Sequence, residues 1–416
     1  MRKFTLVGVV MVALAATGFA AIPASASSGS GAGSAGEYAP VCLPAAVKGL
    51  AHCGAIQLLN PAANWQGSHG PGTTPGKRPG GGGGGSTPPS GYYPAEIQSA
   101  YDLASAISTF ATNNVVQTVA IVDAYDDPNA ASNLATYRSY FKLPPCGIGC
   151  FTKVNQTGGT TYPNASTSWS QEISLDLDMV SAACPGCHIL LVEANSNSLG
   201  DLGAAVNYAA ANAKANVVSN SYGAAEFSGE TAYDSYYHHS GVVITASAGD
   251  GGYGVEYPAA SPFVTAVGGT TLTASTSTRG WAETVWSGTG SGCSAYELNP
   301  GWSPKTTYCT TRTVADTSAD ANPSTGVAVY DSYGQSGWLV FGGTSVASPI
   351  IASVYALADN ASSETVAGLY SANLNRVTSG TNARLCSTYL CNAAASLPSG
   401  YNGPTGNGTP NGTSGF

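Results

Sequence analysis

The chain has 416 residues, of which 43% are hydrophobic and 9% are charged, and its formal net charge is -9. This hydrophobic content is enough to bury a substantial core, which excludes a disordered protein. The acidic balance makes phosphate backbones and anionic membranes poor partners, so we expect no nucleic acid and no membrane among the partners.

The N-terminus has the pattern of an export signal. Arg2 and Lys3 precede an apolar run over residues 4–21, and Ala24-Ser25-Ala26 supplies a small-residue cleavage pattern. The apolar run is short for a membrane span, and no later stretch reaches about 18 uninterrupted apolar residues. We therefore interpret residues 1–26 as a signal peptide and expect a secreted, extracellular protein.

Residues 27–91 are dominated by Gly, Ser and Pro, and Gly80–Gly85 is an unbroken glycine run that cannot hold one conformation. The run is not a phosphate-binding loop, because no Gly-Lys-Ser/Thr follows it. The composition predicts a flexible leader or reduced pro-segment, with Lys77-Arg78 as a candidate processing point.

Ten cysteines agree with an oxidising destination. They fall as near neighbours along the chain, and the simplest prediction is short-range pairing in that order. The predicted pairs are Cys42 with Cys53, Cys146 with Cys150, Cys184 with Cys187, Cys293 with Cys309, and Cys386 with Cys391.

From Tyr92 to the C-terminus the pattern is that of one α/β domain. Ala-rich helical stretches, such as residues 202–215, alternate with apolar runs typical of buried strands. Such alternation predicts a parallel central sheet with helices on both faces. The predicted strands lie at residues 115–125, 189–194, 217–222, 242–247 and 264–267.

A candidate nucleophile lies in Gly342-Gly343-Thr344-Ser345-Val346-Ala347-Ser348-Pro349, directly before an apolar helix over residues 350–358. The glycines permit a tight turn, and a proline suits the first turn of a helix. Ser345 is therefore predicted at a helix N-terminus, where free N–H groups can bind an oxyanion. The alternative is that Ser345 only caps the helix.

A serine nucleophile usually depends on a histidine base, but none of the five histidines lies in a suitable motif. The stretch Cys184-Pro185-Gly186-Cys187-His188 formally matches a c-type haem attachment signature. In an exported chain, a disulfide is the ordinary use of such a cysteine pair. The remaining histidines are His52 and His69 in the leader and the tyrosine-flanked pair His238 and His239.

Carboxylates are better candidates for the base. Glu172 and Asp176 lie four residues apart in a predicted helix over residues 169–179, so they share one face. Two such acids repel unless a proton is shared, and coupled acids can provide a base at acidic pH. Asp250 follows a predicted strand, and the carboxyl ends of parallel strands carry the sites of α/β proteins. The alternatives are solvated helix acids and, for Asp250, a simple turn residue.

These motifs together resemble the sedolisin (serine-carboxyl) peptidases, whose fold is subtilisin-like. The resemblance covers residues 92–416 and rests on Glu172 with Asp176, on Ser247-Ala248-Gly249-Asp250, and on Gly343-Thr344-Ser345. It also includes Tyr257-Pro258-Ala259-Ala260-Ser261-Pro262 and Val267-Gly268-Gly269-Thr270.

The resemblance implies a monomeric endopeptidase that hydrolyses protein or peptide substrates in acid. Ser345 would attack the peptide carbonyl, Glu172 would accept its proton, and Asp176 would hold Glu172 ready. A protonated Asp250 would join the backbone N–H of Ser345 in stabilising the oxyanion. The stretch Ser219-Asn220-Ser221-Tyr222-Gly223 resembles the family's cleft-edge strand, which makes Ser219, Ser221, Tyr222 and Gly223 the expected substrate-binding residues.

The family's calcium site is altered in this chain. Arg376 stands before Val377-Thr378 where the family has a carboxylate, and Asn402 replaces a second carboxylate. An arginine cannot ligate calcium, and the remaining oxygens carry no charge. We hypothesise that the site is metal-free, with the Arg376 guanidinium in place of the cation, and we expect no cofactor.

Two alternatives remain open. An ordinary subtilisin-like protease would use a Ser-His-Asp triad with Asp123 as its acid, but it would need a histidine after that strand. A catalytically inactive secreted homologue would bind peptides or cell-wall material without cutting them.

Overall fold

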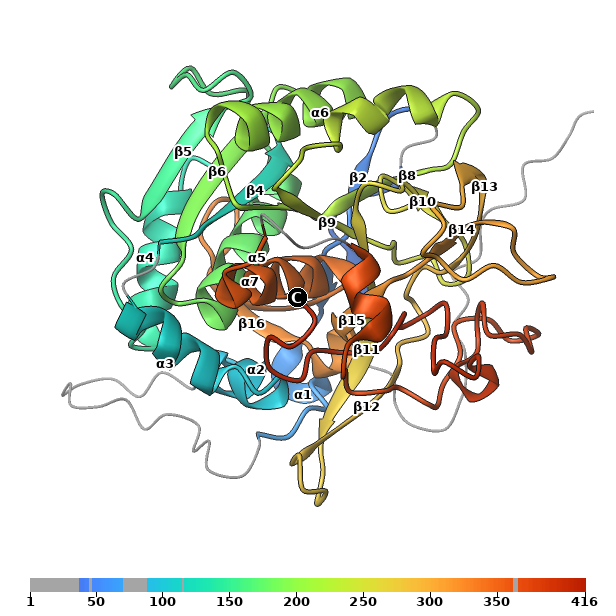
Figure 1. Cartoon of the computed structure of the whole chain (residues 1–416). Coiled ribbons are helices and arrows are strands. Elements are labelled where there is room, and N and C mark those ends of the chain that lie inside the picture. The colour runs from blue at the N-terminus through green and yellow to red at the C-terminus, as the bar shows by residue number, and fades with distance from the viewer. Residues whose placement is uncertain (1–36, 45–46, 70–87, 114–115, 362–365) are drawn as a thin grey trace, which may run out of the picture. The chain divides into compact units, whose positions relative to one another are not determined.

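The computed structural model describes residues 37–44, 47–69, 88–113, 116–361 and 366–416 (Figure 1). The predicted signal peptide at residues 1–26, the glycine run Gly80–Gly85 and Lys77-Arg78 lie outside these residues.

A largely parallel sheet forms the centre of the described unit. Within the described ranges it has eight strands in the order β12-β11-β9-β7-β4-β6-β5, with β15 pairing with β11 off this path. Only β12 runs antiparallel to its neighbour in this sheet as described. Each of the five predicted strand runs contains or overlaps one of these strands, so the predicted parallel sheet is confirmed. The strands are β4 (Thr118–Ala124), β5 (Phe151–Asn155), β6 (His188–Ala194), β7 (Val217–Asn220), β9 (Val243–Ser247), β11 (Thr265–Ala274), β12 (Trp281–Val285) and β15 (Thr317–Asp320).

Helices cover both faces of this sheet, as predicted (Figure 1). Side chains alternate along β4: Val119 and Ile121 pack in the cluster that holds the apolar residues of α5 and α7, whereas Ala120 and Val122 pack with those of α6. The alternation arises because successive strand residues point to opposite faces. The helices are α2 (Pro94–Ala100), α3 (Ala104–Asn113), α4 (Ala130–Tyr140), α5 (Thr167–Ala183), α6 (Leu199–Asn207) and α7 (Thr344–Ala358).

Helix α7 begins earlier than the sequence predicts. Its first residue is Thr344 and its N-cap is Gly343, so Pro349 lies inside the helix rather than in its first turn. Because proline has no N–H, the carbonyl of Ser345, four residues earlier, receives no helical hydrogen bond from it. Ser345 is the second residue of the helix, which confirms its placement at a helix N-terminus.

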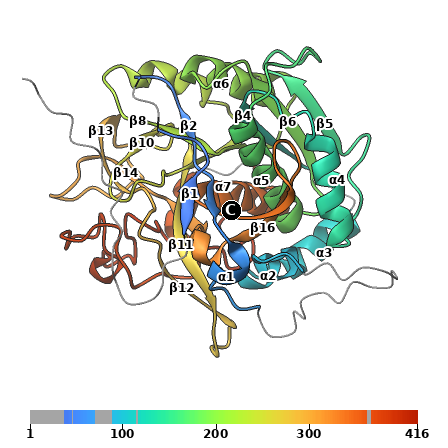
Figure 2. The ribbon, with the colours of Figure 1, turned by 180° about the vertical axis from the view of Figure 1, so that it is seen from behind.

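The segment before residue 70 is structured where its composition predicts a flexible leader. It forms β1 (Tyr38–Pro40), β2 (His52–Cys53), β3 (Ile56–Leu58) and α1 (Pro61–Asn64). Strand β2 pairs with β8 (Tyr222–Ala225), and β3 pairs with both β1 and β17 (Gly337–Gly342). Figure 2 shows this segment in blue, with β2 beside β8. The segment belongs to the compact unit Ala35–Phe416, because apolar positions within it, such as Ala51, Cys53 and Leu58, are buried.

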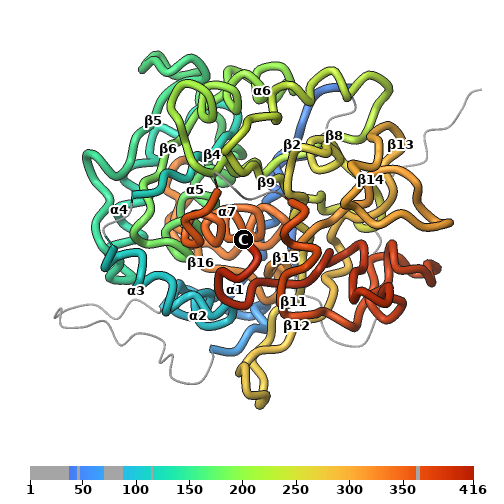
Figure 3. The backbone as a smooth tube through the Cα atoms, viewed as in Figure 1, coloured from blue at the N-terminus to red at the C-terminus, as the bar shows by residue number. Residues whose placement is uncertain are grey.

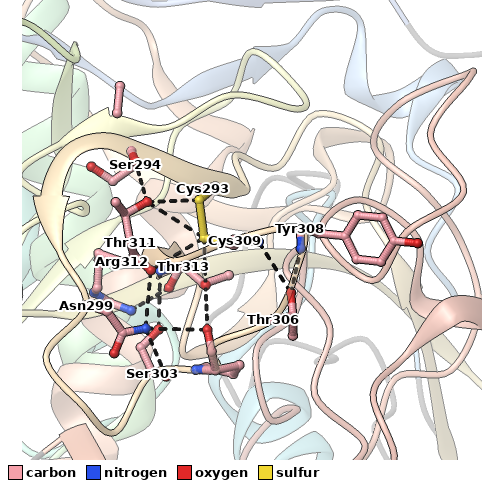
Figure 4. The surroundings of a disulfide bond; sticks show 12 residues. Cys293, Ser294, Asn299, Ser303, Thr306, Tyr308, Cys309, Thr311, Arg312 and Thr313 are labelled. Carbon is pink, nitrogen blue, oxygen red and sulfur yellow. Dashed lines mark hydrogen bonds between the residues drawn. A yellow bond between two sulfur atoms is a disulfide. The ribbon is translucent and has the colours of Figure 1, made fainter.

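All five predicted cysteine pairs are disulfides, which confirms the short-range pairing. Figure 4 shows the Cys293–Cys309 bond, which ties β13 (Gly292–Leu298) to the chain just before β14 (Thr311–Val314). The hydroxyl of Thr311 lies 2.9 Å from Cys293 Sγ and donates to the carbonyl of Ser294. The disulfide and the Thr311 hydrogen bond join β13 and β14 in addition to the backbone pairing of the two strands.

The remaining elements are short and connect these layers (Figure 3). They are β10 (Glu256–Tyr257), β16 (Val327–Asp331), a π-helix (Tyr208–Asn212) and 3-10 helices at Glu230–Tyr236, Pro323–Thr325, Val366–Ser371 and Ala393–Ala395. Among the residues described, no helix has both the length and the apolar character needed to cross a membrane.

Candidate active site

Ser345 lies buried at the start of α7. Gly343, not Ser345, is the N-cap and has a φ of 98°, so the view of Ser345 as a mere cap is wrong. Its hydroxyl donates to the carbonyl oxygen of Ser221 over 3.3 Å. The Ser345 side chain also lies close enough to Glu172 to lower the pKa of that carboxyl group, against the larger effect of burial. Because the bond to Ser221 is long, the hydroxyl proton is only weakly held there.

Glu172 and Asp176 lie on the inner face of α5, and both are fully buried. The alternative of two solvated helix acids is therefore wrong. Burial raises the pKa of Glu172 well above its usual value, and the nearby charge of Asp123 raises it further. Burial also raises the pKa of Asp176, as do the charges of Asp123 and Glu172. The three acids thus form one cluster that titrates together.

Asp123 is the member of this cluster whose role the sequence does not reveal. It lies near the carboxyl end of β4, fully buried, and neither of its carboxylate oxygens has a hydrogen-bond partner among the described residues. Burial therefore raises its pKa well above the usual value. The sequence presents Asp123 only as the acid of a histidine-based triad. Its position at the end of a buried strand is the signal that could have identified it.

Asp250 lies in the loop after β9 and faces the start of α7. Its Oδ1 accepts the N–H of Thr344 over 2.7 Å, while the hydroxyl of Thr344 accepts the N–H of Gly249. Burial raises the pKa of Asp250 to about 7, although the hydrogen bonds from Thr344 lower it. This carboxyl group holds its proton in acid, and within the described ranges its Oδ2 has no hydrogen-bond partner. It is more than a turn residue, because it links the loop to the N-terminus of α7.

The expected cleft-edge strand is present, but its residues differ in orientation. The backbones of Tyr222 and Gly223 pair with Cys53 and His52. The carbonyl of Ser221 faces Ser345. The hydroxyl of Ser219 instead lies 3.0 Å from that of Ser348, in the buried layer between β7 and α7. The Tyr222 hydroxyl is also directed inward, donating to Asn220 over 2.8 Å.

No histidine contacts this site, although all five lie in the described part of the chain. His52 lies 3.7 Å from Glu256, His69 bonds with Glu96, His238 stacks on Phe263, and His239 bonds with the carbonyl of Tyr236. The Cys184–Cys187 disulfide leaves no thiol for haem attachment beside His188. A Ser-His-Asp triad built on Asp123 therefore has no imidazole within contact of Ser345.

The altered calcium region contains an amide network. Asn402 donates to the carbonyl of Val377 over 3.1 Å, and its Oδ1 accepts the N–H and the hydroxyl of Thr405. The Arg376 guanidinium packs against Gly400, where a Cβ would lie 2.7 Å from Nη1. A carbonyl that accepts an amide hydrogen, beside a cation, is a donor set that does not suit calcium. Across the described ranges, no three His, Cys, Asp or Glu side chains gather as metal ligands.

Comparison with known proteins places this geometry in context. The model of the subtilase family (Peptidase_S8) matches residues 152–407. Kumamolisin of Bacillus sp. (strain MN-32) is 28% identical over 303 residues, which cover 64% of this chain and 52% of kumamolisin. Sedolisin of Pseudomonas sp. (strain 101) is 29% identical over 324 residues, covering 68% of this chain and 53% of sedolisin. The chain thus spans about half the length of these curated relatives.

A solved structure is also similar to this chain. It is the Pseudomonas sedolisin, a serine-carboxyl proteinase complexed with two molecules of pseudo-iodotyrostatin. The TM-score is 0.64 at 27% sequence identity, and the match covers 78% of this chain and 96% of that chain.

Proposed function

Because this chain belongs to the subtilase family, as a sedolisin-like member with a subtilisin-like fold, we propose that it is a secreted serine-type endopeptidase that hydrolyses protein or peptide substrates in acid. The observation that carries this proposal is the position of Ser345, which lies beside the buried acid Glu172 and contacts no histidine. Export would account for the oxidised state of all ten cysteines.

The proposed reaction is acyl transfer to Ser345. The hydroxyl oxygen attacks the substrate carbonyl while Glu172 takes the proton. Asp176, one turn further along α5, makes no hydrogen bond to Glu172 among the described residues and interacts with it through charge. Protonated Asp250 and the backbone N–H of Ser345 donate to the oxyanion. Glu172 then passes its proton to the leaving amine, and water hydrolyses the acyl ester.

The electrostatics of the site support an acidic range for this reaction. Asp250 donates only while protonated, and its pKa of about 7 sets the upper limit. At least one proton must also leave the cluster of Asp123, Glu172 and Asp176, because Glu172 must be ionised. The first proton leaves a coupled cluster at lower pH than the next, so one of the three acids can be ionised while the other two keep their protons. We expect an optimum at roughly pH 3–5.

A digest of casein or a peptide from pH 2.5 to 8.5 tests this proposal. We expect Glu172→Gln and Ser345→Ala each to lower kcat at least about 10³-fold. Asp178→Asn is the matched control, since Asp178 is buried on the same helix but accepts the N–H of Tyr330, away from Ser345. Activity that peaks near pH 8 would point to a different base. Peptide binding without hydrolysis would favour the inactive homologue.

We also propose that the C-terminal region is metal-free. By the resemblance, Asn402 and Arg376 stand where a calcium site would need carboxylates. The Asn402 amide donates to the carbonyl of Val377, and the Arg376 guanidinium packs against Gly400, which supports this proposal. Elemental analysis of the purified protein checks this, and stoichiometric calcium would overturn it. The expected monomer stays a prediction that a sedimentation measurement would test.

A further inference from the structure

Four carboxylic acids gather at the end of strand β8, whose start follows the Ser221 carbonyl beside Ser345. They come from the loop after β8, from the 3-10 helix that follows this loop and from β13. Strands β8, β10 and β13 lie on one flank of the molecule (Figure 1). The four residues, which we call the β8 acids, are Glu226, Glu230, Asp234 and Glu297. None of them takes part in the proposed reaction, so their gathering at β8 has a separate cause.

Hydrogen bonds of the β8 acids join β13 to the end of β8. Glu226 directly follows the last residue of β8, and both of its carboxylate oxygens accept from β13. The donors are the hydroxyl of Ser294 and the N–H of Ala295, the latter over 3.1 Å. The same Ser294 hydroxyl accepts the N–H of Glu297 over 2.8 Å. Glu226 and Glu297 therefore meet at one hydroxyl group on β13.

Asp234 makes the corresponding link to β10, the other neighbour of β8. Its Oδ1 accepts the hydroxyl of Tyr257 over 3.1 Å and the hydroxyl of Ser261 over 2.7 Å. Tyr257 lies on β10, which pairs antiparallel with β8. The hydroxyl of Tyr237 also faces Asp234, and burial raises the pKa of both tyrosines, so neither becomes charged near neutral pH. The β8 acids thus hold the end of this strand from two sides.

Two of these acids are buried without enough donors. Glu230 and Glu297 are 0% and 2% exposed, and Oε1 of each has no hydrogen-bond partner among the described residues. Burial raises the pKa of Glu230 to about 8; the hydrogen bond from Phe227 opposes this shift, and the charges of Glu226 and Glu297 add to it. Burial also raises the pKa of Glu297 to about 8, together with the charges of Asp234 and Glu226. Burial raises the pKa of Asp234 as well.

The cations that act on the β8 acids do not neutralise them. Arg312 faces Glu297, but both of its terminal nitrogens bind Asp316. His238 faces Asp234 from the chain just after the 3-10 helix. An imidazole loses its positive charge as the pH rises through neutrality, while carboxyl groups become negative. A rise in pH therefore increases the repulsion among the β8 acids.

We propose that the β8 acids form an acid-dependent clamp that positions the cleft-edge strand β8. In acid, protons remove the charges of the buried acids, so β13 and the 3-10 helix stay closed on the end of β8. As the acids ionise, their repulsion opens this contact and loosens the strand expected to bind substrate. The clamp itself goes beyond the proposed function, and only its effect on substrate rests on that function.

The direction of this pH dependence follows from the raised pKa values. In the open state the acids are solvated, with pKa values near 4, whereas those of Glu230 and Glu297 in the closed state are about 8. The closed state therefore binds protons more tightly than the open state. Closure is favoured fully below about pH 4, and this stabilisation is lost as the pH rises to about 8.

Hydrogen exchange tests the clamp directly. The parent is Ser345→Ala, which lacks the proposed activity, and the test variant adds Glu230→Gln and Glu297→Gln, since glutamine has the shape of protonated glutamate but cannot ionise. At pH 8.5 we expect the amides of residues 223–237 and 292–298 to be at least about 10-fold more protected in the variant than in the parent, with no difference at pH 4. Asp178→Asn is the matched control, because burial also raises the pKa of Asp178, on α5, and it should not restore this protection.

The exchange results decide the proposal with or without the double variant. In the parent alone, protection of residues 223–237 and 292–298 should fall between pH 6 and pH 8.5 by more than the protection of β4. A fall no larger than that of β4 would overturn the clamp. So would a double variant that is as open as the parent at pH 8.5. If the double variant does not fold, Glu297→Gln alone takes its place.

Peptide hydrolysis by the chain that keeps Ser345 tests the effect on substrate. Between pH 4 and pH 7, KM should rise at least about threefold in wild type and by less in the variant with Glu230→Gln and Glu297→Gln. The pH profile of kcat should be the same in both, because Asp250 and the acids beside Ser345 are unchanged. An equal rise of KM in both proteins would overturn the positioning of β8. If neither protein hydrolyses peptide at any pH, the proposed function fails, and the exchange measurement decides the clamp by itself.

Discussion

Two groups of buried carboxylates in this protein are accommodated in opposite ways. Asp316, which follows β14, accepts hydrogen bonds from both terminal nitrogens of the fully buried Arg312, over 2.8 and 2.5 Å. It also accepts the hydroxyl of Tyr370 and the N–H of Ala266, each over 2.7 Å. In the part of the chain that the structure describes, the cluster of Asp123, Glu172 and Asp176 has no cation beside it, and the pKa of each acid is raised instead.

The difference separates a structural use of a buried charge from a chemical one. A paired and fully hydrogen-bonded carboxylate can stay ionised, since the interactions with its partners offset the free energy of desolvation. An unpaired buried acid keeps its proton and releases it only at a higher pH. A base that exchanges a proton with Ser345 must be an unpaired acid of this kind. A tightly bound cation would keep the carboxylate permanently ionised.

The largest effect should come from breaking the ion pair. Arg312→Met leaves the Asp316 carboxylate buried without its cation, and we expect a loss of about 3–5 kcal/mol in the free energy of unfolding. Arg384→Met, at an exposed position, is the control and should change it by less than about 0.5 kcal/mol. Denaturant unfolding at neutral pH measures both. Adding Asp316→Asn should recover part of the loss, and a single-variant loss near that of the control would contradict this view of Arg312.

A smaller effect should come from changing pH, which acts on the buried acids whose pKa values are raised. Their pKa values lie near 4 in the unfolded chain but are raised in the fold by burial, to about 7 for Asp250 and about 8 for Glu256. The folded state therefore binds more protons than the unfolded state between these values. The stabilisation is complete below about pH 4 and is lost as pH rises to about 8.

We accordingly expect the Tm to fall between pH 4 and pH 8, by on the order of 10 °C. Calorimetry on Ser345→Ala measures this in a protein without the proposed peptidase activity. The Asp123→Asn and Asp176→Asn substitutions combined in that background should flatten the dependence, because they remove two of the titrating groups. A Tm that rises toward pH 8 would contradict the raised pKa values.

The smallest expected effect concerns how Asp123 changes the pKa values of the other two acids in its cluster. The charge of Asp123 raises the pKa of both Glu172 and Asp176, so Asp123→Asn should lower both values. The acid limb of the kcat/KM profile should then move to lower pH by about 0.5–1 unit. The upper limb, which Asp250 sets, should stay in place, and Asp178→Asn should move neither limb. An acid limb that moves upward would exclude Asp123 from the cluster's electrostatics.

Local patterns in the sequence were sufficient for several features. The five cysteine pairs are at most 16 residues apart, and such short loops leave little freedom for other partners. The parallel strands are short apolar runs, and the spacing of Glu172 and Asp176 directly implies a shared helix face. Ser345 could be placed at a helix start because of the glycines before it, although the proline, taken as a first-turn signal, put that start too late in the chain.

Other features depend on contacts between distant parts of the chain, which no local pattern contains. Asp123 joins Glu172 and Asp176 only because β4 and α5 pack together, and its unpaired state depends on everything that excludes water from that layer. Gly54 lies beside Ser345, 291 positions later in the sequence, through strand pairing and one disulfide in a segment whose composition predicts a flexible leader. The sequence alone thus determined which residues could react, since residue type and short spacing set the chemistry. Only the tertiary structure decided which of them meet and which lose their solvent, because burial and proximity are properties of the packed chain.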